Sequence, residues 1–131
     1  MATPVHSMIR VLNEKCSIDF YSTNFDLNLC DRYEFDDFAL IYLRNKSSSF
    51  ELELTINFGR DREYEMGDGY GHLAVVVDDV DSHYERLVNN GLNINSPKDF
   101  MHNGKRLARF FFVTDPDGYK IEVIQRDGRF S

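Results

Sequence analysis

Long apolar runs and clustered positive charge are both missing from this sequence. No stretch approaches the roughly 20 apolar residues of a membrane helix, and no secretory signal is recognisable, so we expect no membrane partner. The 15 Lys and Arg are outnumbered by 22 Asp and Glu, which gives a formal net charge of −7. Because phosphate contacts require clustered Lys and Arg, no nucleic-acid partner is expected either.

Cysteine is scarce as well. Only Cys16 and Cys30 occur, and they form no CxxC pair. We interpret them as two free thiols in a reducing compartment and expect a cytoplasmic protein, with a single disulfide as the alternative.

Apolar residues, by contrast, are plentiful. They make up 42% of the 131 residues and include 11 Phe and 7 Tyr, so a packed core is expected. This length fits one compact domain or two very small fused units, and we expect a single domain over residues 1–131.

The first half contains four strand-like runs, at residues 5–12, 27–33, 38–44 and 50–58. Asn13 is a suitable N-cap for a helix that ends near residue 25. In that helix, the spacings of Cys16 with Phe20 and of Ile18 with Tyr21 predict a buried face.

The second half restarts the pattern after a charged linker at 59–70. Asp79 is a suitable N-cap for a helix to about residue 90, and Gly91 is placed to end it. Strand-like runs are expected at 71–77, 92–95 (the weakest), 107–113 and 119–125. The last two are separated by a strong turn signal, Asp115-Pro116-Asp117-Gly118.

The order β-α-β-β-β therefore occurs twice, in repeats at 5–58 and 71–126. Each repeat begins its first strand near a histidine, His6 or His72, and carries a glutamate in its last strand, Glu53 or Glu122. Alone, each His suggests a packed residue and each Glu a solvated one. Their equivalent places in a duplicated unit instead favour a shared role.

That role is metal binding. Glu53 and Glu122 lie within apolar strands, where a carboxylate is costly unless it is paired or coordinated. Two imidazoles and two carboxylates suit Ni²⁺, Co²⁺, Zn²⁺, Fe²⁺ or Mn²⁺, and two waters would complete an octahedron. Because no thiolate is among the ligands, a closed structural zinc site is not indicated. The sequence predicts an open metal site of His6, Glu53, His72 and Glu122.

Several segments resemble glyoxalase I (lactoylglutathione lyase), of the vicinal-oxygen-chelate superfamily. In chain order they are HSMIRV from His6, SIDFY from Ser17, ELTINFG from Glu53, YGHLA from Tyr70 and DPDGYKIE from Asp115. The DPDG turn occurs throughout that superfamily, whereas ELT-x-N-[FW]-G together with YGH is specific to glyoxalase I. The likeness covers nearly the whole chain.

The resemblance implies an α+β fold in which two βαβββ modules form an eight-stranded cupped mixed sheet. It implies a homodimer whose sites are shared between chains, with His6 and Glu53 from one chain and His72 and Glu122 from the other. It implies one divalent metal per site. Nickel or cobalt is favoured because short members with His at the first ligand position resemble the Ni²⁺/Co²⁺-activated bacterial group, and zinc is the alternative.

The activity so implied is methylglyoxal detoxification by a lyase with glutathione as cosubstrate. The hemithioacetal of methylglyoxal and glutathione becomes S-lactoylglutathione by proton transfer through a metal-bound enediolate. Glu122 is the expected base, with Glu53 as its near-symmetric counterpart. Arg10 and Asn57 match family positions that hold the γ-glutamyl end of glutathione, and their strand phase places them beside His6 and Glu53.

Some positions depart from the family pattern. Asp68 stands where some relatives carry an Arg that holds the glycyl carboxylate, and Asp26 replaces a common turn glycine. Residues 100–106 correspond to a Lys-containing loop but are two residues longer. Lys105 or Arg106 in this loop is expected either to clamp the glycyl carboxylate or to be merely solvated. These changes leave another thiol open as cosubstrate.

Three other functions fit the same fold. An epimerase acting on an acyl-CoA would need a more basic entrance than Lys105, Arg106 and Arg109 provide. A ring-cleaving dioxygenase uses two His and one carboxylate, so the fourth ligand disfavours it. A non-catalytic small-molecule-binding protein would have no use for four intact ligands.

Overall fold

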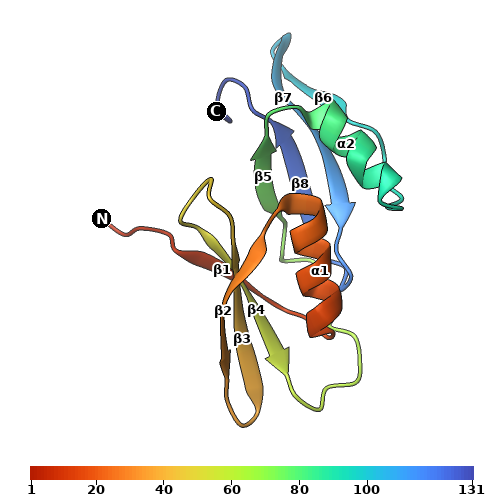
Figure 1. Ribbon diagram of the computed structural model, residues 1–131. Helices are drawn as coiled ribbons and strands as arrows, with labels where there is room; N and C mark the ends of the chain where they lie inside the picture. Colours follow the sequence, from red (N-terminus) through yellow and green to blue (C-terminus); the bar gives the residue numbers. More distant parts are fainter. The chain divides into compact units, whose positions relative to one another are not determined.

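A computed structural model describes all residues from 1 to 131 and divides them into two compact units, Met1–Glu65 and Met66–Ser131. Each unit has the order β-α-β-β-β (Figure 1). The predicted α+β class and the two βαβββ modules are confirmed. Within the chain, the eight strands form two separate four-stranded mixed sheets. No helix is both long and apolar enough to cross a bilayer.

The first unit has the sheet order β1-β4-β3-β2, so its first and last strands are neighbours. Strand β1 runs parallel to β4, and the other pairs are antiparallel. The elements are β1 (His6–Arg10), α1 (Glu14–Phe25), β2 (Asn28–Glu34), β3 (Phe38–Arg44) and β4 (Glu51–Asn57).

The second unit repeats this topology with the order β5-β8-β7-β6 and a parallel β5–β8 pair. Its elements are β5 (Leu73–Val77), α2 (Val80–Asn89), β6 (Lys98–His102), β7 (Lys105–Thr114) and β8 (Lys120–Gln125). The parallel pairing requires a crossover, and in each unit the helix lies within that crossover.

The helices begin where the sequence predicts. The side chain of Asn13 accepts a hydrogen bond from the Cys16 amide, and that of Asp79 accepts one from Ser82. Helix α1 is followed by the C-cap residue Asp26, which adopts a left-handed conformation with φ 55°. An L residue is disfavoured there, but Asp is among the few that tolerate it because its short polar side chain bonds locally, here with Asn28.

One face of each sheet forms the core. In β4, Leu52, Leu54 and Ile56 point into it, with Ile41 of β3 and Tyr21 of α1 fully buried beside them. Each such side chain contributes about 1.5–3 kcal/mol on burial. The second unit has the corresponding set, comprising Val80, Leu87, Phe111, Val113, Ile121 and Val123. The alternate residues of β4 and β8 are thereby directed to the opposite face of their sheets.

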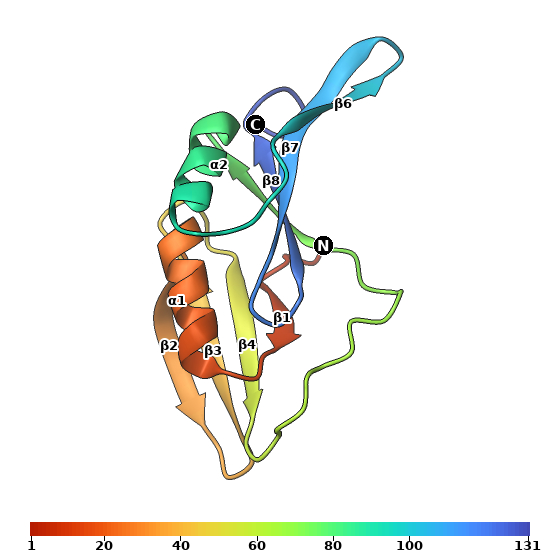
Figure 2. The ribbon, with the colours of Figure 1, turned by 90° about the vertical axis from the view of Figure 1, so that its right-hand side faces the viewer.

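Two sequence predictions are wrong in detail. The strand expected at 92–95 does not form; the second strand of the second unit is β6, Lys98–His102. It pairs with β7 through a two-residue turn at Asn103 and Gly104, which have φ of 50° and 77°. Figure 2 shows this hairpin reaching beyond β5 and β8. In α1, Cys16 is exposed rather than part of the buried face.

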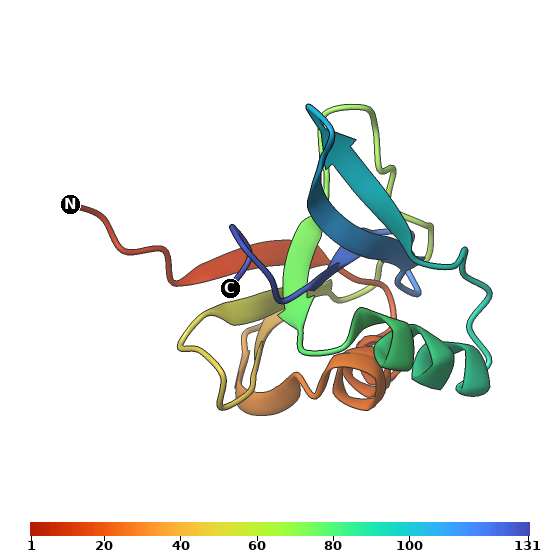
Figure 3. The same cartoon turned by 90° about the horizontal axis from the view of Figure 1, so that it is seen from above.

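The segment before β1 is exposed and runs outward from the strand (Figure 3). Regular structure in the first unit therefore begins at His6, the residue from which the predicted site also begins.

Candidate metal centre

Glu53 lies in the middle of the first sheet. Its neighbour on β1 is Met8 and its neighbour on β3 is Tyr42. The residue is only 8% exposed. An ionised carboxylate at such a depth is stable only with partners close by, and the structure supplies two.

The first partner is His6, whose Nε2 lies 3.4 Å from Glu53 Oε2. His6 stands two residues before Met8, so strand alternation puts its imidazole on the face that carries Glu53. The second partner is Tyr42, the β3 neighbour of Glu53. The interaction of the Tyr42 hydroxyl with the Glu53 carboxylate is the main cause that raises the pKa of Tyr42 to about 12. The Tyr42 ring also contacts the His6 ring edge-on, with centroids 6.1 Å apart.

The second unit reproduces the pair. Glu122 lies between Ala74 of β5 and Phe112 of β7, and His72 stands two residues before Ala74. His72 Nε2 lies 3.6 Å from Glu122 Oε2. The two imidazoles have nearly the same exposure, 40% for His6 and 39% for His72. The sequence repeat is thus also a repeat of side-chain geometry.

Both pairs fit a divalent cation. Two ligands about 2.1 Å from one cation, at an angle of roughly 90° to 110°, lie roughly 3.0 to 3.4 Å apart. The His6–Glu53 distance is at the upper end of this range, and the His72–Glu122 distance is just above it. The donors are an imidazole nitrogen and a carboxylate oxygen in each case. No group of three or more His, Cys, Asp or Glu in the chain gathers around one point, so the four predicted ligands come together two by two.

The His72 imidazole opens onto a pocket. This pocket has a volume of about 390 Å³ and lies within the second unit; it is lined by Met66, Gly67, Tyr70, Gly71, His72, Phe112, Gly118, Tyr119 and Lys120. A small ligand in this pocket would therefore lie against His72.

Glu51 lies on the same face of β4 as Glu53, two residues nearer the start of the strand. It is the β1-neighbour of His6, and its Oε2 accepts a hydrogen bond from Cys30 Sγ at 3.0 Å. Arg44 Nη1 lies 3.8 Å from the same oxygen. Burial, and then the hydrogen bond to Glu51, raise the pKa of the Cys30 thiol. Sequence reasoning found no role for Cys30, because this contact depends on the pairing of β2 with β3.

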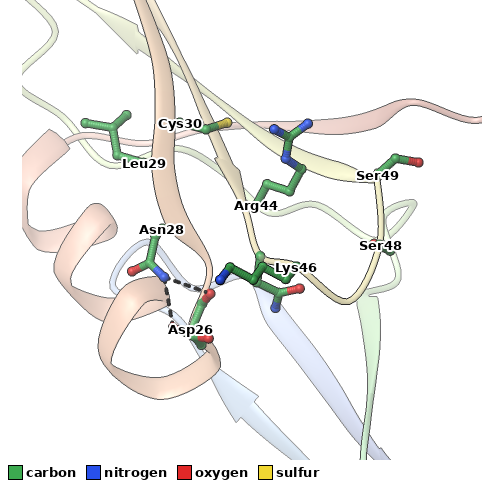
Figure 4. A pocket seen from close by; sticks show the side chains of 9 residues that line it. Asp26, Asn28, Leu29, Cys30, Arg44, Lys46, Ser48 and Ser49 are labelled. Carbon is green, nitrogen blue, oxygen red and sulfur yellow. Dashed lines mark hydrogen bonds between the residues drawn. The ribbon is translucent and has the colours of Figure 1, made fainter.

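Cys30 and Arg44 also belong to a larger pocket, of about 850 Å³, at the end of the first sheet (Figure 4). Most of its lining residues are polar or charged, with Asn28 hydrogen-bonded to Asp26 on one side and the β3–β4 loop on the other. Its lining comprises Asp26, Asn28, Leu29, Cys30, Arg44, Asn45, Lys46, Ser48 and Ser49.

Arg10 and Asn57 lie further along the face of Glu53, as predicted from strand phase. Arg10 ends β1 opposite Thr55 and is exposed. Asn57 ends β4, and its Nδ2 donates a hydrogen bond to the Tyr64 hydroxyl at 2.9 Å. Both polar groups are at the end of the sheet away from the Cys30 pocket.

Lys105 and Arg106 begin β7, beside the Asn103-Gly104 turn. Arg106 already interacts with two carboxylates, Asp127 at 3.2 Å and Asp99 at 3.6 Å. Lys105 is exposed and helps to line a pocket of about 330 Å³ at the turn. Of the two cations proposed for a carboxylate clamp, Lys105 is the better placed.

The chain is similar in sequence to known proteins of one family. Residues 3–123 match the family model of the Glyoxalase/Bleomycin resistance protein/Dioxygenase superfamily. The chain is 37% identical to the lactoylglutathione lyase of Neisseria meningitidis, over 93% of this chain and 89% of that protein. It is 34% identical to the lactoylglutathione lyase of Escherichia coli O157:H7, over 92% of this chain and 90% of that protein.

Solved structures of glyoxalase I have a similar fold. Glyoxalase I of Leishmania major, described as trypanothione-dependent, superposes with a TM-score of 0.78 at 30% identity, over 95% of this chain and 87% of that one. Glyoxalase I of Zea mays gives a TM-score of 0.82 at 30% identity, and there the chain spans 45% of the maize protein. An antibiotic-binding protein from Streptomyces, with a TM-score of 0.75 at 22% identity, shares the fold alone.

Duplicated His–Glu pairs on duplicated modules, together with these matches over nearly all of its length, place the chain in the Glyoxalase/Bleomycin resistance protein/Dioxygenase superfamily and, within it, in the lactoylglutathione lyase family.

Proposed function

We propose that this chain converts the hemithioacetal of methylglyoxal and glutathione into S-lactoylglutathione, at a divalent cation held by His6, Glu53, His72 and Glu122. The observation that carries the proposal is the pair of His–Glu contacts, 3.4 and 3.6 Å, at equivalent places in two modules. The lactoylglutathione lyases to which the chain is similar support it independently. Methylglyoxal detoxification in the cytoplasm is the cellular role that follows.

Nickel or cobalt is the proposed metal, with zinc as the alternative. Imidazole nitrogen is a suitable ligand for all three metals, and the carboxylate oxygens make the ligand set harder. The thiolate ligands that are typical of closed structural zinc sites are absent from this set. A bound cation would lower the pKa of the substrate C–H and stabilise the negative charge that forms when the proton leaves.

Each complete site is proposed to combine the first module of one chain with the second module of a partner copy. One module supplies two ligands, fewer than the three or four protein ligands that catalytic metals usually take. Two-fold pairing of copies would bring both modules to each site and make two identical sites. In such a dimer, the two four-stranded sheets would join as the predicted eight-stranded cupped sheet.

The proton transfer is assigned to the carboxylates. Glu122 removes the proton from C1, the hemithioacetal carbon, and returns it to C2, the former ketone carbon. The electron pair of the C1–H bond passes through a C1–C2 double bond into the new C2–H bond. The C1 hydroxyl loses its proton and becomes the thioester carbonyl, while the C2 oxygen gains a proton, so no external oxidant or reductant is needed. Its greater exposure, 20% of the side chain against 11% for Glu53, supports Glu122 in this role. The cosubstrate is held at its γ-glutamyl end by Arg10 and Asn57, and at its glycyl carboxylate by Lys105, with Arg106 as a weaker second cation.

The decisive measurement follows thioester absorbance with methylglyoxal and glutathione, after Ni²⁺, Co²⁺ or Zn²⁺ is returned to metal-free protein. We expect turnover only with metal, and loss of both metal and turnover in His72→Ala. His102→Ala is the matched control, because His102 is exposed on β6 and should keep both. A metal-loaded wild type without turnover would overturn the activity.

The shared site has its own test. His6→Ala and His72→Ala chains, each inactive, are unfolded and refolded together. If sites form between chains, half the dimers are mixed and each mixed dimer contains one intact site, so about a quarter of wild-type activity should return. Sites within one chain would give no recovery.

A further inference from the structure

The segment after β4 folds back onto the end of that strand. A β-turn is closed by a hydrogen bond from the Arg60 amide to the Asn57 carbonyl at 3.4 Å, and Gly59, the third residue of the turn, has the positive φ, 83°, that a type II turn requires there. Residues 58–65 are exposed apart from Arg60 and Tyr64, which are partly buried. These two side chains therefore anchor the segment.

Arg60 and Tyr64 contact each other, and Arg60 also bonds the backbone between them. The Arg60 guanidinium carbon lies 3.9 Å from the centroid of the Tyr64 ring, within the range of a cation–π contact. Arg60 donates two further hydrogen bonds to backbone carbonyls, from Nε to Arg62 at 3.0 Å and from Nη2 to Glu63 at 3.1 Å. Arg60 thus closes the segment on itself and holds the Tyr64 ring in place.

The Tyr64 hydroxyl sets the orientation of the Asn57 amide. Asn57 Nδ2 donates a hydrogen bond to this hydroxyl at 2.9 Å, in a partly buried setting. An Asn amide can turn over about its last single bond, which exchanges the places of Nδ2 and Oδ1. A committed Nδ2 therefore also decides where Oδ1, the only acceptor of this side chain, is directed. A ligand ammonium can donate to Oδ1 but not to Nδ2.

We infer that Tyr64, held by Arg60, is a positioning residue that keeps the Oδ1 of Asn57 directed toward the ammonium group of the γ-glutamyl end of glutathione. The inference rests on the proposed function, in which Arg10 and Asn57 hold that end. The γ-glutamyl end has one ammonium and one carboxylate, so a guanidinium and an amide oxygen are complementary to it. A guanidinium alone binds any carboxylate, whereas an oriented Oδ1 selects for a free ammonium. Tyr64 thus contributes to specificity for the cosubstrate.

Two ligands that differ only at the ammonium separate this role from a structural one. S-Methylglutathione keeps the ammonium, and its N-acetyl derivative lacks it but keeps both carboxylates. Binding of each ligand to the protein with Ni²⁺ present is measured by calorimetry, so the readout does not depend on turnover. The variant is Tyr64→Phe, which removes only the hydroxyl, and the matched control is Tyr84→Phe on α2, in the other unit. Thermal unfolding of each variant shows that it folds.

We expect the wild type to bind S-methylglutathione more tightly than the N-acetyl derivative. Tyr64→Phe should weaken binding of S-methylglutathione about two- to tenfold, the usual effect of one hydrogen bond between neutral groups, and leave binding of the N-acetyl derivative nearly unchanged. Tyr84→Phe should change neither affinity. The inference is overturned if Tyr64→Phe weakens both ligands by the same factor or weakens neither, and also if the wild type does not distinguish the two ligands.

Two further variants test the chain of contacts. In an Asn57→Ala background the amide is absent, so adding Tyr64→Phe should cause no further loss of S-methylglutathione binding, and an additional loss would contradict the inference. Arg60→Ala removes the contact with the ring. It should weaken S-methylglutathione selectively, as Tyr64→Phe does, but by a smaller factor because the hydroxyl remains. An equal loss for both ligands would remove Arg60 from this role.

The outcome for Tyr64 is separable from that of the proposed reaction. If the ligands are distinguished as expected but the hemithioacetal is not converted, the proposed activity fails and the positioning role of Tyr64 stands. If the hemithioacetal is converted and Tyr64→Phe keeps the wild-type KM and kcat, the activity stands and the inference about Tyr64 fails.

Discussion

Cys30 Sγ lies 3.0 Å from Glu51 Oε2, two residues along β4 from Glu53. The thiol and the proposed metal ligand therefore share one face of the first sheet without contacting each other.

This contact predicts that the Cys30 thiol reacts slowly with alkylating reagents. Because burial and Glu51 raise the pKa of Cys30, the reactive thiolate is under-populated in the folded protein at pH 8 and increases only as pH rises further. Glu51→Gln removes the second cause and should speed alkylation of Cys30 by iodoacetamide several-fold at pH 8. Cys16, exposed on α1, is the internal control and should not change. If alkylation of Cys16 and Cys30 became faster by the same factor, the cause would instead be a general destabilisation of the fold.

Glu122→Gln should separate metal binding from catalysis. The amide keeps the shape and one oxygen donor, so part of the nickel affinity should remain. The loss of the base should lower kcat by two orders of magnitude or more, since general base catalysis contributes about 10²- to 10⁴-fold. Incorporation of deuterium from solvent into lactoylglutathione measures the transfer directly. Turnover near wild type would remove Glu122 from this role.

Lys105→Ala should raise KM for the glutathione adduct, whereas Arg106→Ala should have a smaller effect because Asp99 and Asp127 already hold Arg106. The glycyl ethyl ester of glutathione lacks the carboxylate to be clamped. With this ester, wild type and Lys105→Ala should have the same KM. A Lys105 effect that persists with the ester would show that the lysine does not hold the carboxylate.

Arg109 joins α2 to β6 by bonding Asp81 at 2.7 Å and Asp99 at 3.1 Å. The Arg109 hydrogen bond lowers the pKa of Asp81 below its unfolded value. The stabilisation is therefore present above the unfolded pKa, near 4, and disappears as pH falls through the folded pKa. Asp81→Asn should lower Tm slightly at pH 7, since exposed ion pairs contribute at most about 1 kcal/mol. The difference from wild type should vanish near pH 2. Asp36→Asn, in the exposed β2–β3 turn, controls for net charge.

Leu54 is fully buried and lies beside Glu53 in sequence, on the opposite face of β4. Leu54→Ala should lower the free energy of unfolding by about 2–5 kcal/mol. Nickel affinity of the folded fraction should remain near that of wild type, because the ligand face is unchanged. Denaturant unfolding and calorimetry on the same sample test both parts. A large loss of nickel affinity would show that the two faces are coupled.

Periodicity was sufficient to predict most of the fold. Alternation in β4 separates Leu52 and Leu54 from Glu53, and this fixed the face of the ligand before its partners were known. Asn13 and Asp79 marked the helix starts because capping is a local interaction. The error at β6 has a local cause too: every residue of β6 is exposed, so no apolar pattern marks it. The Asn103-Gly104 pair that turns this hairpin was the available signal.

The proximity of Tyr42 to Glu53 and the hydrogen bond of Cys30 to Glu51 could not be predicted in this way. The first joins the neighbouring strands β3 and β4, and the second reaches from β2 across β3 to β4. Both depend on register, which a shift of one residue would reverse. The bulge between Leu29 and Asp31 makes such a shift within β2 itself. The sequence therefore predicts which residues can be ligands more readily than which residues restrain them.

The parallel pairing of β1 with β4 has a consequence for biosynthesis. His6 leaves the ribosome well before its partner Glu53, which arrives only with the last strand of the module. The first ligand pair is therefore finished only when the whole first module has folded, and this can occur before any residue of β8 has been translated. Only a correctly closed first module would thus present both of its ligands together to the second module of a partner copy.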